Sequence, residues 1–253
     1  MTSKRGSNSF PTSLHLDNET SDDPNIIAKL FASFFSPSFN NPDSPIDSAY
    51  FSYLEHCPNT TFNGFLPDSS TVTKSIYTLD DSHFPGPDGV PSIIIKRCSL
   101  PLIPPLVHLF RLSLQTAVFP TLWKLSFITP THKNGSRNSI RNYRPIAKLS
   151  TIPKLFEASI YDALFFHSKL LIFHKQHGFV RKRSTTTNLV HFTSTVTRAL
   201  ECGSEVDCIY TDFRKAFDSL SHNIIAYKLH MLGFPDPFVA WISSYLSNRS
   251  CSI

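Results

Sequence analysis

Proline is the residue that most restricts the folds open to this chain. The sequence has 19 prolines among its 253 residues against only 8 glycines, together with 22 phenylalanines. Because proline lacks a backbone N–H and interrupts helices and central strands, it predicts many short elements rather than a few long ones. The phenylalanines predict that these elements pack on aromatic side chains. A long coiled coil is therefore excluded.

No apolar run is long enough to predict a membrane-spanning helix. The longest candidate, residues 100–112, is interrupted by Pro101, Pro104 and Pro105. Residues 1–13 lack the apolar core of a secretory signal, so we expect an intracellular protein of the cytoplasm or the nucleus. The 5 cysteines are odd in number and form no C-x-x-C pair, which predicts free thiols, buried or partly exposed, rather than disulfides or a zinc site.

Charge is distributed unevenly along the chain, although the net charge is only +5. Residues 1–88 carry four lysines and arginines against eleven acidic residues, whereas residues 89–200 carry sixteen against two. Such a one-sided segment repels itself unless it faces a polyanion, and nucleic acid is the usual one. A solvated basic face is the alternative. The basic residues are interleaved with aromatic core formers, which favours a folded nucleic-acid-binding surface.

The pattern of apolar residues and breakers predicts a mixture of helices and strands. Residues 1–22 lack periodicity and are expected to form a flexible lead-in, followed in residues 23–71 by one helix, ending near Pro37, and a linker. Two strands around the turn 134–136 are expected to form a basic hairpin. The predicted helices are 92–98, 102–117, 152–170, 184–200 with Ser184 as its N-cap, and 222–232, and the predicted strands are 123–129, 143–147 and 206–213.

The sharpest chemical feature is the segment 206–222, in which an apolar strand delivers Asp212 at its end and a helix follows. A strand end is a rigid platform from which a carboxylate can reach a metal ion. An aspartate before a helix more often caps that helix. The residues alone leave both roles open for Asp212, and capping is the role they suggest for Asp218.

Four sequence blocks together make the chain resemble the reverse transcriptases of non-LTR (LINE-type) retrotransposons. In chain order they are Gly86-Pro-Asp-Gly-Val-Pro91; Trp123-Lys124 with His132-Lys-Asn-Gly-Ser-Arg137 and Asn142-Tyr-Arg-Pro-Ile146; Gln176-His-Gly-Phe179 with Arg183-Ser-Thr-Thr-Thr-Asn-Leu189; and Tyr210-Thr-Asp-Phe-Arg-Lys-Ala-Phe-Asp218. One block alone is weak, since Gly-Pro-Asp-Gly is also an ordinary turn, but four in the family's order are specific.

The resemblance implies an α+β fold with the right-hand architecture of polymerases. Residues 72–205 would form the fingers-like part of the domain and residues 206–253 the start of the palm. The family's later Ala-Asp-Asp hairpin and its Gly-x-Pro-Gln-Gly segment do not occur in this sequence. We therefore expect an incomplete, truncated domain.

The resemblance also assigns roles to the residues around Asp212. In this family two Mg²⁺ ions roughly 4 Å apart activate the primer 3′-hydroxyl, and Asp212 would bridge them with the backbone carbonyl of Phe213 as a further ligand. Phe217 would lie under the incoming sugar, although a core phenylalanine is an equally good interpretation. Helix capping stays our preferred role for Asp218. Since one carboxylate cannot hold two divalent cations with useful affinity, we expect weak or absent Mg²⁺ binding here.

Basic residues of the predicted hairpin and of a later loop match family positions that contact phosphates. Lys133 and Arg144 would clamp the phosphates of the nucleotide, whereas a solvated face is the better interpretation for Arg137 and Arg141. The residues that would contact the template, with flanking of the Ser184 helix as the alternative for the last two, are Gln176, His177, Arg181, Lys182 and Arg183.

The implied activity is nucleotidyl transfer to a primer 3′ end, as an RNA-directed DNA polymerase. An RNA template, a DNA primer and a deoxynucleoside triphosphate would be the partners, with no membrane involved. We expect the polypeptide alone to be inactive. A non-catalytic RNA-binding module derived from the fingers is the main alternative, and a splicing-type maturase shares the fold but fits the blocks less well.

Overall fold

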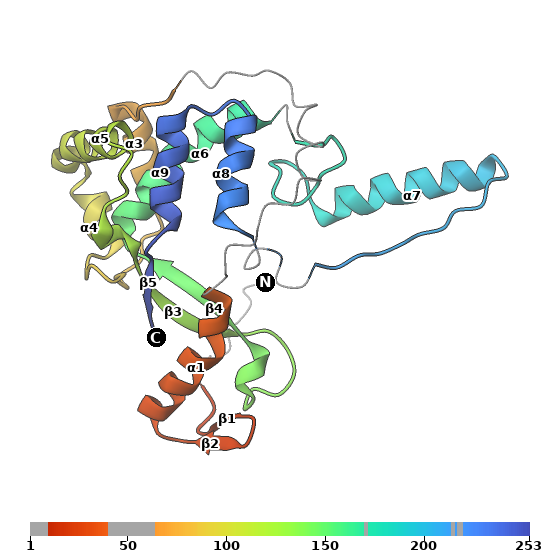
Figure 1. Ribbon diagram of the computed structural model, residues 1–253, viewed down its shortest axis with the longest axis horizontal. Coiled ribbons are helices and arrows are strands. Elements are labelled where there is room, and N and C mark those ends of the chain that lie inside the picture. The colour runs from red at the N-terminus through yellow and green to blue at the C-terminus, as the bar shows by residue number, and fades with distance from the viewer. Residues whose placement is uncertain (1–9, 40–63, 170–171, 214–215, 217–219) are drawn as a thin grey trace.

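The computed structural model describes residues 10–39, 64–169, 172–213, 216 and 220–253 (Figure 1). Helices dominate this part of the chain and two small sheets accompany them, so the predicted α+β class is confirmed. None of the described helices is both long and apolar enough to cross a lipid bilayer. The four described cysteines are free, as expected, but all four are exposed, whereas we expected buried or partly exposed thiols.

Six helices form a helical body with an aromatic core. They are α3 (Ser69–Tyr77), α4 (Ser92–Arg97), α5 (Ser99–Gln115), α6 (Thr151–Ser168), α8 (His222–Met231) and α9 (Asp236–Leu246). Phe110 of α5 and Phe156 of α6 stack with their ring centroids 4.4 Å apart. Trp241 of α9 packs edge-on against Phe156 and donates its indole N–H to Ser113 Oγ over 3.0 Å. Aromatic side chains therefore stack at the centre of this core, as the composition predicted, and aliphatic residues surround them.

A second, smaller core lies between the N-terminal segment and the predicted basic hairpin. Strands β1 (Leu14–Leu16) and β2 (Glu19–Ser21) pair antiparallel, and helix α1 (Pro24–Phe39) follows. Leu14 and Phe31 are buried together with Ile128 and Tyr143 of the hairpin. The expectation of little order in residues 1–22 is therefore wrong for residues 10–22, because the apolar Leu14 anchors them. Residues 1–9 lie outside the described part.

The basic hairpin is present and belongs to a three-stranded sheet. Strands β3 (Leu125–His132) and β4 (Tyr143–Leu149) pair antiparallel, and β5 (Ser250–Ser252) adds to the other edge of β3 in parallel. The predicted first strand begins two residues late, because Trp123 lies in a 3-10 turn (Thr121–Lys124). Its indole packs edge-on against Phe110 and Phe156 of the helical body instead of extending the sheet.

Helix α7 (Thr185–Glu201) projects from the helical body as an arm (Figure 1). Its start is predicted correctly, since Ser184 is the N-cap and forms a capping box with Thr187. None of its residues is buried. Helix α1 continues two residues beyond its predicted end at Pro37, which lies in the last turn.

Candidate nucleic-acid interface

The β3–β4 hairpin has one buried face and one exposed face. Thr131 pairs with Arg144, and Phe127 pairs with Lys148, so these four side chains share the exposed face. Residues of the opposite face, including Ile128 and Tyr143, are buried against α1. The exposed side chains therefore stand on a sheet whose position is fixed from behind.

Lys133 and Arg144 lie on the same side of this hairpin. Arg144 is exposed and lies opposite Thr131, and Lys133 follows Thr131 by two residues, which is the spacing that returns a side chain to the same face. The Lys133 backbone N–H donates to Asn142 O over 2.9 Å and continues the pairing toward the turn. Among the described residues neither cation has an acidic partner, so both remain available for an anion.

Lys148 and two aromatic rings extend this exposed face, and the sequence analysis missed them. Lys148 Nζ lies 5.7 Å from the ring centroid of Phe84, which is exposed, and the exposed Phe127 pairs with Lys148 across the strands. Interleaved cations and exposed rings are typical of surfaces that bind single-stranded nucleic acid. The alternation Arg144, Ile146, Lys148 is the signal that would have found the lysine, because it places all three on one face. We call Phe84, Phe127, Lys133, Arg144 and Lys148 the hairpin face.

The turn of the hairpin is held by its own hydrogen bonds. Gly135 has φ of +77°, and Asn142 donates from Nδ2 to Ser136 O over 2.9 Å. The Tyr143 hydroxyl donates to Arg137 O over 2.7 Å, and burial raises the pKa of this phenol. Arg141 forms an ion pair with Asp17 from the N-terminal hairpin. Arg141 is exposed, as the interpretation of a solvated face expected, but its ion pair with Asp17 was not predicted.

The Gly86-Pro-Asp-Gly block fixes the other end of the hairpin. A Cβ on Gly86 would lie 2.6 Å from Ser150 Cα and 2.8 Å from Leu149 O, so only glycine permits this approach. The Asp88 N–H donates to Ser150 Oγ over 3.2 Å, and Thr151 Oγ1 donates to Val90 O over 3.1 Å. The loop therefore secures the junction of β4 and α6 and, through it, the position of the hairpin face.

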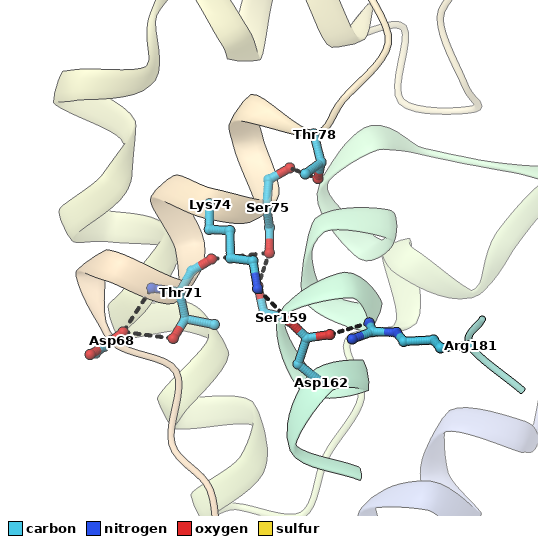
Figure 2. Close-up of polar contacts among 8 residues, drawn as sticks. All are labelled: Asp68, Thr71, Lys74, Ser75, Thr78, Ser159, Asp162 and Arg181. Carbon is cyan, nitrogen blue, oxygen red and sulfur yellow. Dashed lines mark hydrogen bonds and ion pairs between the residues drawn. The ribbon is translucent and has the colours of Figure 1, made fainter. Parts of the chain in front are cut away.

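The predicted template-binding loop is tied to the helical body by Arg181. The Arg181 guanidinium forms an ion pair with one carboxylate oxygen of Asp162 on α6 (Figure 2). The other oxygen of Asp162 accepts a hydrogen bond from Lys74 Nζ of α3 over 2.6 Å. The guanidinium also lies over the rings of Tyr161 and Phe165, 4.9 and 5.2 Å from their centroids. Hydrogen bonds from Lys74 and Arg181 lower the pKa of Asp162 and keep it ionised. In this structure the Arg181 side chain therefore binds to helix α6 of the protein itself.

Three of the other residues of that loop also make contacts within the protein, whereas Lys182 is exposed. Arg183 donates to the backbone carbonyls of His174 and Gln176, and Gln176 donates to Gly178 O over 3.1 Å. His177 Nδ1 lies 2.9 Å from Thr187 Oγ1 at the start of α7, and its pKa is lowered, first by desolvation and then by the Arg183 charge. Lys182 is exposed with φ of +63° and, in the described part of the chain, has no ion-pair partner. Template contact by this loop stays a prediction.

The strand predicted at 206–213 is not formed. Residues 204–213 carry no regular structure, and Figure 1 shows them returning along α7 toward the helical body. Tyr210 meets Phe192 of α7 with ring centroids 6.2 Å apart, but Tyr210 and Phe213 remain about four-fifths exposed. A strand requires a hydrogen-bonded neighbour, and none of the described strands lies beside this segment. The prediction of a β-platform for Asp212 is therefore wrong for this structure.

Asp212 stands exposed in that segment, and no contact in the described structure brings it to Lys133 or Arg144. Phe217 and Asp218 lie outside the described residues. Within the described residues, no group of three or more His, Cys, Asp or Glu side chains is arranged to hold a metal ion. One exposed carboxylate does not fit a site for two Mg²⁺ ions, which requires several rigid oxygen ligands.

Comparison with known proteins supports the resemblance to reverse transcriptases. The family model for reverse transcriptase (RNA-dependent DNA polymerase) matches residues 131–253. The chain is 28% identical over 181 residues, 70% of its length, to the probable RNA-directed DNA polymerase from transposon BS of Drosophila melanogaster, of which this covers 20%.

Two further relatives agree with this match. The Pol polyprotein of the type-1 retrotransposable element R2 of Popillia japonica is 27% identical over 67% of this chain and 23% of its own length. The polymerase from the mobile element jockey of Drosophila melanogaster is 26% identical over 78% of this chain and 22% of its own length. The chain thus spans about a fifth of the length of these relatives. Taken with the hairpin and its family motifs, these matches confirm that the chain resembles the reverse transcriptases of non-LTR retrotransposons.

Proposed function

We propose that this chain forms the fingers-like, nucleic-acid-binding part of an RNA-directed DNA polymerase whose reaction is nucleotidyl transfer to a primer 3′ end. The observation that carries the proposal is the hairpin face, where Lys133, Arg144 and Lys148 stand free of described acidic partners beside two exposed phenylalanines. The relatives named as RNA-directed DNA polymerases support the same activity.

The hairpin face suits the phosphates and bases of its proposed ligands. The Arg144 guanidinium can bond a phosphate through two parallel N–H groups, and the Lys133 ammonium adds a point charge nearby. The exposed rings of Phe84 and Phe127 offer planes on which bases can stack without regard to sequence. The buried face behind them holds the strands still, so little ordering is required on binding.

The right-hand arrangement and a two-Mg²⁺ mechanism remain part of the proposal for the polymerase domain. The described residues do not assemble ligands for two ions, so we propose that this polypeptide by itself binds nucleic acid without extending a primer. This same observation favours a second function, a non-catalytic RNA-binding module. Primer extension on an RNA template with Mg²⁺ separates the two: incorporation that Asp212→Ala abolishes would overturn the non-catalytic interpretation.

Binding of a labelled RNA–DNA primer-template tests the shared part of the proposal. We expect the double variant Lys133→Ala, Arg144→Ala to weaken binding and to reduce the slope of log affinity against log salt by about 1.4 to 1.8, since each phosphate contact contributes roughly 0.7 on a single strand and roughly 0.9 on a duplex. Arg97→Ala, which removes an exposed cation on α4, is the matched control and leaves the slope unchanged. A double variant with wild-type affinity and slope would refute the role of the hairpin face.

A further inference from the structure

A pocket beside the hairpin turn has the chemistry of a base-binding site, and the proposed function does not use it. It has a volume of about 330 Å³. The residues that line it come from the start of the described chain, from β3, from the turn and from β4: they are Phe10, Thr129, Pro130, Thr131, His132, Arg137 and Tyr143. No acidic residue is among them, which makes the pocket unsuited to a metal ion.

The aromatic residues of the pocket form a rigid platform. Phe10 lies parallel to Tyr143, with 5.8 Å between ring centroids and 11° between planes. Tyr143 is held by edge contacts with Phe31 and His132, at 5.2 and 5.4 Å, and by its hydrogen bond to Arg137 O. Phe10 itself is 51% exposed. One face of its ring is therefore packed on a fixed partner, and a flat ligand has access to the rest.

The polar groups of the pocket suit an anion attached to a flat ring. The Arg137 side chain is exposed and has no acidic partner among the described residues, although its neighbour Arg141 is paired with Asp17. Thr129 and Thr131 are also exposed. Strand β5 pairs only with residues 125–127 of β3, so the same edge of β3 at Thr129–His132 has no strand partner in the described sheet. Hydrogen-bonding groups thus surround the aromatic platform.

We propose that this pocket, which we call the Phe10 pocket, takes one unpaired base of a single-stranded nucleic acid by stacking on Phe10, with the adjoining phosphate bound by Arg137. The inference rests on the proposed function, because it needs a protein that binds nucleic acid. Unpaired bases are recognised by aromatic stacking together with arginine and backbone contacts, which are the groups gathered here. A second binding point outside the hairpin face would set the path of the strand over the hairpin.

The test compares binding of a fluorescein-labelled 12-nucleotide oligouridine with that of the same strand made abasic. We expect Phe10→Leu to weaken binding of the oligouridine about fivefold or more, which is the low end for the loss of one stacked base. Phe10→Tyr, which keeps an aromatic ring, should bind the oligouridine as wild type does. Binding of the abasic strand stays unchanged in both variants. Arg137→Gln weakens binding of both strands, because it acts on the phosphate.

Phe166→Leu is the control, since it removes another exposed ring, on α6. Circular dichroism melting of each variant checks that the second core is intact. If Phe10→Leu binds the oligouridine as well as wild type does, or loses the abasic strand equally, the stacking role is overturned while the proposed function stands. If wild type binds neither strand, the proposed function fails together with this inference.

Discussion

Replacing Gly86 is predicted to destabilise the protein more than replacing Gly89, the other glycine of the Gly-Pro-Asp-Gly block. A methyl group in Gly86→Ala would meet Ser150 Cα at 2.6 Å, Leu149 O at 2.8 Å and Ser150 N at 2.9 Å. All three are backbone atoms at the junction of β4 and α6, so relief requires the loop or the strand to move. Overpacking of this kind costs roughly 1–3 kcal/mol. We expect a loss of about 3 kcal/mol in the free energy of unfolding, because no flexible side chain can yield.

Alanine substitutions at two other glycines are the comparisons for Gly86→Ala. Gly89→Ala meets no atom within 4 Å but requires φ of +72°, so only the backbone penalty of roughly 1–2 kcal/mol applies. Gly178→Ala meets nothing within 4 Å and has no positive φ, so we expect a change within about 0.5 kcal/mol. Urea unfolding followed by circular dichroism measures all three. A Gly86→Ala variant as stable as Gly178→Ala would show that the loop does not press on Ser150 and would refute the reasoning.

Three further predictions concern the helical body. Burial raises the pKa of the Glu157 carboxyl above its ordinary value of 4.5, so the stability of the protein falls as the pH rises from 4.5 through the raised pKa. Glu157→Gln should therefore unfold at a higher temperature than wild type at pH 7, and this difference should vanish in melts near pH 4. Trp241→Phe loses the hydrogen bond to Ser113 and part of the core, which should lower the free energy of unfolding by roughly 1–3 kcal/mol in urea titrations. Asp162→Asn breaks the exposed ion pairs with Lys74 and Arg181 and should lower the free energy of unfolding by less than about 1 kcal/mol. Trypsin should nevertheless cleave the loop after Arg181 faster, and an unchanged cleavage rate would contradict the role of the contacts drawn in Figure 2.

Local signals in the sequence were sufficient to predict most elements of the helical body and the hairpin. Ser184 caps α7 as predicted, and the apolar spacing of residues 152–170 gave α6 within two residues at each end. These features depend on neighbours a few residues away, which the sequence displays. The resemblance placed Lys133 and Arg144 in the hairpin, whereas the face that they share follows from the strand pairing in the structure.

The predictions that failed depend on partners far along the chain. Residues 206–213 have the composition of a strand, but a strand forms only beside another, and the described sheets do not reach this segment. The pairing of Arg181 with Asp162, 19 residues away, was likewise not predicted, while contact of Arg181 with a template stays an untested prediction. Residues 10–22 were expected to lack order because their polar composition hides Leu14, the residue that packs into the second core.

Photo-cross-linking tests the central claim, that the hairpin face meets nucleic acid, most directly. A single-stranded RNA carrying 4-thiouridine would be bound at low salt, irradiated and digested, and the cross-linked peptides identified by mass spectrometry. We predict cross-links within residues 125–149, which hold β3 and β4, and their loss when Lys133 and Arg144 are both alanine. Cross-links confined to the helical body, with none in 125–149, would contradict the account.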